Sequence, residues 1–101
     1  MKEQQNEVQE FVEKNNLQTE PAFRIMDLVA ELGEVVADAT KSSHYGKHKG
    51  ELKVKEDEVG DVLFSLCALC NNLDIDAEEA FDQAMEKYEE RIQDKGEPSS
   101  K

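Results

Sequence analysis

Residues 58 to 70 have the sequence Glu58-Val59-Gly60-Asp61-Val62-Leu63-Phe64-Ser65-Leu66-Cys67-Ala68-Leu69-Cys70. Apolar side chains recur in this segment at three- and four-residue steps, which is the period of an α-helix with a buried face. The apolar run from Val62 to Cys70 is about half the length that crosses a bilayer. We therefore predict a buried helix from about Glu51 to Asn71, and no association with a membrane.

The same helical period recurs upstream of this segment. A short amphipathic helix is predicted over residues 3–15, where apolar side chains are spaced among charges. A second helix is predicted over residues 19–41, with Thr19 as its N-cap and Pro21 in its first turn. The apolar stripe of this second helix is wide, so we expect more than one neighbouring helix to cover it.

A fourth helix is predicted downstream of the apolar segment. Asp76 and Glu79 form a capping box at its start, and Gly96 follows its end. The whole chain has two prolines, five glycines and no long alternation of polar and apolar residues, so the predicted class is all-α. We predict one bundle of four to five helices over residues 1–95 and a frayed tail over residues 96–101.

The wide apolar faces of the second and third helices also predict self-association. A chain of 101 residues buries only a modest core of its own. Apolar faces that one chain leaves uncovered can pack against further copies in a symmetric assembly. We therefore expect helices of two subunits to pack together in a homodimer or homotetramer.

The charge of the chain restricts its ligands. Asp and Glu number 24 against 12 Lys and Arg, which gives a formal net charge of -12. This charge repels the phosphate backbone of DNA or RNA, so long nucleic acid is excluded as a ligand. A nucleotide is repelled as well, unless local cations and a divalent metal reverse the potential where it binds.

Targeting signals and cysteine usage indicate an intracellular protein. The first ten residues are polar and acidic, unlike the basic and then apolar start of a secretory signal. The two cysteines, Cys67 and Cys70, lie inside the apolar segment, so we interpret them as small buried side chains and not as a disulfide framework or a redox motif. We predict a cytoplasmic location.

Acidic side chains interrupt two of the apolar helices at helical spacing. Glu31 and Glu34 are neighbours at positions i and i+3, and so are Glu58 and Asp61. The first pair belongs to a stripe on one narrow helix face, which comprises Asp27, Glu31, Glu34 and Asp38. Two such pairs facing each other repel unless a cation binds. Oxygen ligands favour a hard ion, so the pattern predicts Mg²⁺, with Mn²⁺ as a substitute, and solvated helix faces are the alternative.

The two acidic motifs and their surroundings resemble the MazG-like nucleoside triphosphate pyrophosphohydrolases. Glu31-x-x-Glu34 and Glu58-x-x-Asp61 are separated by the 23 residues from 35 to 57. The segments Leu28–Val36 and Glu58–Glu90 share the similarity, which extends to the spacing of Lys87 and Arg91. The resemblance covers roughly residues 20 to 93, which is most of the chain.

This resemblance implies an all-α enzyme in which Glu31, Glu34, Glu58 and Asp61 hold Mg²⁺ and form the catalytic centre. Water attacks the α-phosphorus of a (deoxy)nucleoside triphosphate, which releases a nucleoside monophosphate and pyrophosphate. One of the four carboxylates acts as the base, and the sequence leaves open which one. Ala30 stands where the family often has a second Glu, so the number of metal ions also stays open.

Four further residues are predicted to bind the substrate. Lys87 and Arg91 are one helical turn apart and suit phosphate, although pairing with nearby acids is the alternative. Asn72 resembles a family position that contacts nucleotide. Lys47 belongs to a basic segment that we expect to attract a polyanion, with ordinary charge balance as the alternative. The other lysines of that segment are Lys49, Lys53 and Lys55.

Other classes of protein are weighed against this one. A phosphoribosyl-ATP pyrophosphohydrolase would keep the same acidic site and change the substrate. A di-iron carboxylate bundle requires a His three residues after a Glu on two helices, and neither acidic motif has one. A non-enzymatic helical interaction module is the remaining alternative, and it predicts no effect of Mg²⁺ on stability.

Overall fold

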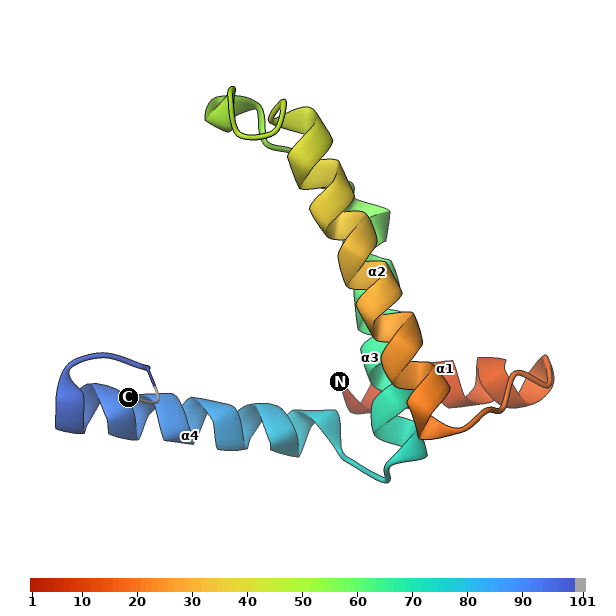
Figure 1. Cartoon of the computed structure of the whole chain (residues 1–101). Helices are drawn as coiled ribbons and strands as arrows, with labels where there is room; N and C mark the ends of the chain where they lie inside the picture. The colour runs from red at the N-terminus through yellow and green to blue at the C-terminus, as the bar shows by residue number, and fades with distance from the viewer. Residues whose placement is uncertain (100–101) are drawn as a thin grey trace.

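The computed structural model describes residues 1–99, apart from the side chain of Lys49. Within that range the chain folds into four α-helices and one short 3-10 helix, without a strand (Figure 1). The elements are α1 (Lys2–Lys14), α2 (Pro21–Ser42), η1 (Lys49–Glu51), α3 (Glu56–Asn72) and α4 (Ala77–Lys95). The all-α prediction is confirmed. The predicted role of the Lys49 side chain and the last two residues of the predicted tail lie outside the described residues.

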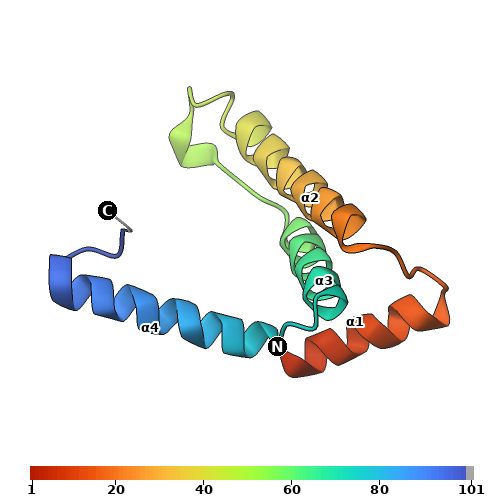
Figure 2. The ribbon, with the colours of Figure 1, turned by 60° about the horizontal axis from the view of Figure 1, so that its bottom comes forward.

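The two central helices, α2 and α3, lie side by side and run in opposite directions (Figure 2). α1 packs across α3, and Phe11 contacts Phe64 edge-on with ring centroids 5.9 Å apart. Between these two helices lies the small buried core, to which Met1 adds a partly buried side chain, and whose buried members are Val8, Val12, Cys67 and Ala68. The chain thus buries an α1–α3 interface while most of the α2 surface stays uncovered.

The two cysteines lie in this buried region, as predicted. Both are free thiols on α3, and Cys67 is 1% exposed. Burial raises the pKa of Cys67 and of Cys70, and the pKa of Cys67 is raised further by the neighbouring Cys70. Buried, protonated thiols are poor nucleophiles, which agrees with a packing role.

The start of α2 differs from the prediction by one residue. Thr19 was expected as the N-cap, but the helix begins at Pro21 and its N-cap is Glu20, with φ −81° and ψ 154°. The cause is local, because a residue before proline is sterically driven to extended backbone. Pro21 therefore takes the first helical position, where its missing N–H costs nothing.

The start of α3 was also predicted too early, near Glu51, whereas the helix begins at Glu56. The hydroxyl of Ser42 accepts a hydrogen bond from the Lys53 N–H (2.7 Å) and donates one to the Lys53 carbonyl (3.0 Å), which fixes an extended link before the helix. The first turn of α3 contains three acidic residues, which the positive end of the helix dipole favours. The sequence alone contains no sign of this link, because the contact that holds it joins Lys53 to Ser42 at the end of α2.

The ends of α4 lie where they were predicted, with Asp76 as the N-cap. Among the described residues, only the Asp76 half of the predicted capping box forms, because no hydrogen bond joins the Asp76 N–H to the Glu79 side chain. The Asp76 carboxylate accepts hydrogen bonds from the backbone N–H groups of Glu78 (2.9 Å) and Glu79 (3.3 Å). Gly96 ends the helix in the left-handed conformation, with φ 78°, and its N–H donates to the Ile92 carbonyl (2.9 Å). Both ends are local motifs that a sequence specifies directly.

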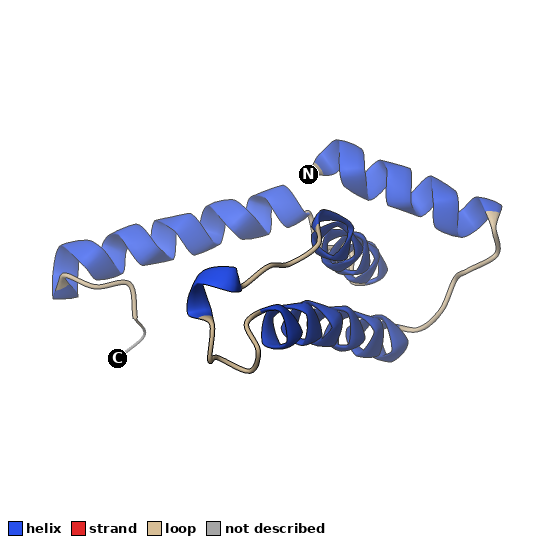
Figure 3. Cartoon of the chain, turned by 90° about the horizontal axis from the view of Figure 1, so that it is seen from above, coloured by secondary structure: helices blue, strands red, loops and turns tan. Residues whose placement is uncertain are grey.

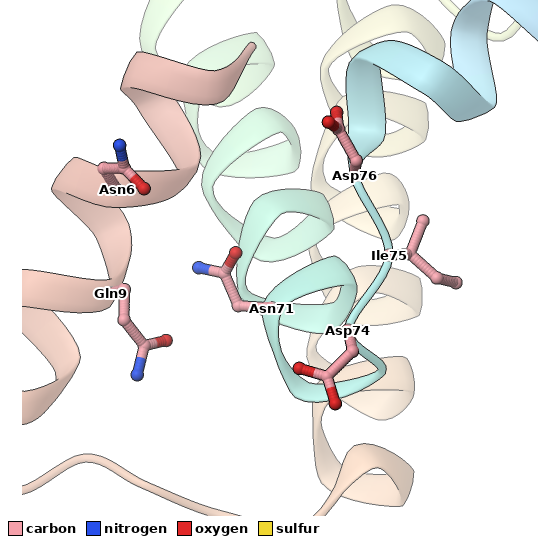
Figure 4. Close-up of a pocket in the computed structure, with 6 residues that line it drawn as sticks. All are labelled: Asn6, Gln9, Asn71, Asp74, Ile75 and Asp76. Carbon is pink, nitrogen blue, oxygen red and sulfur yellow. The ribbon is translucent and has the colours of Figure 1, made fainter.

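Gln5 joins α1 to the turn between α3 and α4. Its side chain is buried, and its Nε2 donates to Asn71 Oδ1 (3.0 Å) and to the Ile75 carbonyl (2.9 Å). Its Oε1 accepts from the Ala77 N–H (2.8 Å), and Asn71 Nδ2 donates back to the Gln5 carbonyl (2.9 Å). Figure 4 shows the neighbouring polar pocket, in which Asn6 of α1 faces Asn71 of α3. These bonds fix the direction in which α4 leaves the core.

α4 extends away from the α2–α3 pair, so the chain is open (Figures 1 and 3). Its radius of gyration is 16.7 Å, against about 13 Å for a compact chain of 100 residues. Its accessible surface is 7761 Å², against about 5,800 Å² for a compact monomer of this mass. Exposed apolar side chains include Phe23, Met26, Val29, Val36 and Phe81. None of the described helices is long and apolar enough to cross a bilayer.

Candidate metal centre

The packing of α2 against α3 brings three of the four predicted metal ligands together. Glu31 comes from the middle of α2, and Glu58 and Asp61 come from the first turns of α3. One carboxylate oxygen of each lies within 4.8 Å of those of the other two. The i and i+3 spacing places two acids on one face of α3, and the antiparallel pairing adds the third from α2.

Glu34, the fourth predicted ligand, lies one turn further along α2 and is exposed. Its carboxylate is not part of the closely spaced group. It is still near enough for its charge to act on Glu58. Its predicted role as a ligand stays a prediction.

The repulsion between the clustered acids affects the pKa of Glu58. Partial burial raises the pKa of the Glu58 carboxyl above its ordinary value, and four neighbouring negative charges raise it further, from Asp38, Asp57, Asp61 and Glu34. Each of these effects disfavours the ionised carboxyl. A bound cation would reverse them, since it favours the ionised form that can serve as a ligand.

Asp38 is a neighbour of the site that was not among the predicted site residues. Its carboxylate accepts a hydrogen bond from the Lys55 N–H (3.3 Å), which ties the C-terminal part of α2 to the residue that precedes α3. The sequence contains a signal for this position, because Asp38 continues the acidic stripe through Glu34 at helical spacing. Asp38 thus helps to set how α2 and α3 lie against each other at the cluster.

The donor set fits a hard divalent cation. Glu31 and Glu58 are half-buried, whereas Asp61 is exposed, so one side of the cluster is open to solvent and ligands. Among the described residues, no Lys or Arg side chain forms an ion pair with any of the three. Mg²⁺ is usually held by one or two carboxylates, with waters and substrate phosphates completing its shell. Three oxygen ligands beside an open position meet that requirement.

Lys87 and Arg91, predicted to bind phosphate, are not brought to this cluster within one chain. Both lie on α4, which points away from the α2–α3 pair (Figure 1). Lys87 Nζ lies 5.3 Å from the centroid of the Tyr88 ring, and the Arg91 guanidinium lies 5.8 Å from it. Arg91 also donates to the carbonyl of Pro98 (3.2 Å), within the predicted tail. Their role in binding phosphate stays a prediction.

Asn72 and Lys47, the other two predicted substrate residues, lie at opposite ends of the α2–α3 pair. Asn72 is the last residue of α3, and its Nδ2 donates to the Thr19 carbonyl (2.7 Å) in the link before α2. Lys47 is exposed in the turn after α2, where its backbone N–H donates to the His44 carbonyl (3.2 Å). Contact of either residue with substrate stays a prediction.

Comparison with known proteins points to one family. The family model of the MazG nucleotide pyrophosphohydrolase domain matches residues 48–95, which include Glu58 and Asp61. The chain is also similar to the uncharacterized protein YpjD of Bacillus subtilis (strain 168), with 39% identity over 79 residues. That similarity covers 74% of this chain and 69% of the relative. No solved structure matches the chain.

The fold and the cluster define the chain as an all-helical protein with a carboxylate site between two antiparallel helices. The matches identify it more closely: it belongs to the MazG nucleotide pyrophosphohydrolase family. The resemblance inferred from the two acidic motifs is thereby confirmed.

Proposed function

We propose that the protein is a Mg²⁺-dependent nucleoside triphosphate pyrophosphohydrolase. It would cleave (deoxy)nucleoside triphosphates between the α- and β-phosphates, giving a nucleoside monophosphate and pyrophosphate. The observation that carries the proposal is the approach of Glu31, Glu58 and Asp61 to within 4.8 Å of one another. The family match adds that two of these acids lie in a nucleotide pyrophosphohydrolase domain.

The three clustered carboxylates would hold the metal ion on the open side of the α2–α3 pair. When bound, Mg²⁺ neutralises phosphate charge and lowers the pKa of coordinated water, and Mn²⁺ can substitute for it. Glu34 lies next to the cluster and is exposed, so it is available as a further ligand or as the acceptor of the proton of the attacking water. The half-buried Glu31 and Glu58 would fix the position of the ion relative to both helices.

We further propose that the functional unit is a homo-oligomer, with a dimer as its smallest form. The accessible surface exceeds that of a compact monomer by roughly 2,000 Å². An interface that hid this area on each chain would fall in the range of obligate homodimers. If α4 of one copy covers α2 of the other, Lys87 and Arg91 can approach the carboxylates of the partner copy. A cytoplasmic location is likewise a prediction.

The enzymatic proposal is tested by incubating the protein with a panel of nucleoside triphosphates and Mg²⁺, and separating pyrophosphate from orthophosphate. Glu58→Gln and Asp61→Asn should each abolish pyrophosphate release. Glu10→Gln, which neutralises an exposed acid on α1, is the matched control and should keep wild-type activity. Wild-type protein that hydrolyses no triphosphate and gains no thermal stability from Mg²⁺ would rule out the proposal and favour a non-enzymatic module.

A further inference from the structure

We propose that a pocket formed by Lys41, Lys53 and Lys55 binds the β- and γ-phosphates of the substrate, which leave as pyrophosphate. The pocket has a volume of about 580 Å³. It lies between the last turns of α2 and the extended link that precedes α3, and it is lined by Asp38, Lys41, Ser42, Lys53, Val54 and Lys55. This inference rests on the proposed function and adds to it a site for the leaving group.

The pocket concentrates positive charge in an acidic protein. Three lysines and one aspartate line it, so its formal charge is positive although the chain carries -12 overall. Among the described residues, none of the three ammonium groups has an ion-pair partner within 4.0 Å. Lysines that are not neutralised by neighbouring carboxylates are available to an anionic ligand.

The backbone around the pocket is fixed, so the lysines start from defined positions. Ser42 holds both the N–H and the carbonyl of Lys53 through its hydroxyl. Asp38 holds the N–H of Lys55. Lys41 stands in the last turn of α2, where a cation also offsets the negative end of the helix dipole. The link before α3 therefore places Lys53 and Lys55 in the lining of the same pocket as Lys41.

The pocket and the carboxylate cluster lie along the same two segments, α2 from its middle to its C-terminal end and the start of α3 with the link before it. Asp38 belongs to the pocket lining, and its carboxylate accepts a hydrogen bond from the N–H of Lys55, the residue directly before α3. Lys55 precedes Glu58 by three residues, and Asp38 follows Glu31 by two helical turns, which is about 10 Å along the axis. A triphosphate whose α-phosphate lies at the cluster can therefore extend its terminal phosphates toward the lysines. The nucleoside would then lie on the side away from the pocket.

The pocket would stabilise the negative charge of the leaving group. Attack of water at the α-phosphorus breaks the bond between that phosphorus and the oxygen that bridges it to the β-phosphorus. The electron pair of this bond stays on the bridging oxygen, which leaves as part of pyrophosphate. Cations placed at the departing phosphates stabilise the charge that develops there. Lysine is suited to this task as a flexible point charge with three donors.

The test compares Lys41→Gln/Lys53→Gln with wild type and with Lys14→Gln, an exposed lysine at the far end of α1 that serves as the control. Calorimetry with inorganic tripolyphosphate and Mg²⁺ measures binding without turnover. Hydrolysis of a nucleoside triphosphate gives KM, and inorganic pyrophosphate gives the product-inhibition constant. Circular dichroism verifies that the variants fold, and Lys41→Arg/Lys53→Arg restores the charge.

We expect the double Gln variant to bind tripolyphosphate and pyrophosphate about tenfold more weakly and to raise KM by a similar factor. The Arg variant and Lys14→Gln should stay within about twofold of wild type. An active wild type with an unaffected double Gln variant would overturn the pocket and leave the proposed function standing. A wild type that hydrolyses nothing, yet binds tripolyphosphate through these lysines, would retain the phosphate pocket and reject the proposed function.

Discussion

Replacement of Gln5 by alanine tests whether the junction of α1, α3 and α4 holds the fold together. The side chain of Gln5 is 8% exposed and makes three hydrogen bonds of 2.8 to 3.0 Å, to Asn71, Ile75 and Ala77. Each contributes about 1 kcal/mol net, and truncation leaves their partners with fewer bonds in a partly buried site. We therefore expect Gln5→Ala to lower the free energy of unfolding by about 3 kcal/mol.

The assay is urea unfolding followed by circular dichroism at one fixed protein concentration, so that self-association contributes equally to every variant. Gln9→Ala is the matched control. Gln9 is exposed on the same helix, and its side chain bonds within α1, to Glu13 (2.7 Å). Its loss should cost less than about 0.5 kcal/mol. Equal effects of the two substitutions would refute the argument that Gln5 locks the junction.

Three further perturbations test the helix cap, the buried thiols and the uncovered apolar faces. Asp76→Ala removes the acceptor of two backbone N–H groups of α4, so the free energy of unfolding in urea should fall by about 1 kcal/mol, and an unchanged value would contradict the capping role. Burial raises the pKa of Cys67 and Cys70, so the folded protein keeps both thiols protonated while the unfolded chain ionises them from their ordinary value of 9.0. The stabilisation of the folded state by its protonated thiols is therefore complete below that pH and is lost as the pH rises through the raised pKa. Urea unfolding from about pH 8 to 10.5 should show a shallower loss of stability in Cys67→Ala/Cys70→Ala than in wild type. Equal slopes of stability against pH would count against this reasoning. Val29→Glu charges an exposed apolar position of α2, and sedimentation equilibrium should show it as a monomer while wild type has at least twice the chain mass of 11.5 kDa; a monomeric wild type at micromolar concentration would exclude the dimer.

The features that the sequence predicts well are local or repeat with the helical period. Asp76 caps α4 through backbone groups two and three residues away, and Gly96 ends the same helix within one turn. The acidic cluster was predictable for a related reason. The i and i+3 spacing fixes Glu58 and Asp61 on one face of a helix, and only one further helix is needed to bring Glu31 to them.

The features that the sequence did not predict depend on contacts between distant residues. α3 begins at Glu56 because the Ser42 hydroxyl holds Lys53, eleven residues away, and no local pattern announces that pairing. The lysine pocket arises from the same link, since it forms only when the segment before α3 folds back on the end of α2. The distribution of charge along the sequence therefore predicted that the whole basic segment, including Lys47, attracts a polyanion. It did not distinguish the lysines that line the pocket from the others.

The position of α4 is a different kind of case. The sequence predicts the helix and its ends, and its apolar stripe predicts that something covers it. Within one chain, α4 contacts α1 and leaves large apolar side chains such as Phe81 and Ile92 exposed. If another copy of the chain covers these side chains, the apolar stripe predicts that α4 is covered. The stripe does not show that the covering helix belongs to a different subunit.

The central claim is that this carboxylate cluster directs water to the α-phosphorus of a nucleoside triphosphate. Hydrolysis in ¹⁸O-labelled water with Mg²⁺, followed by mass spectrometry of both products, tests it most directly. The account predicts that the label enters the nucleoside monophosphate and that pyrophosphate stays unlabelled. Label in pyrophosphate, or release of labelled orthophosphate as the first product, would contradict it.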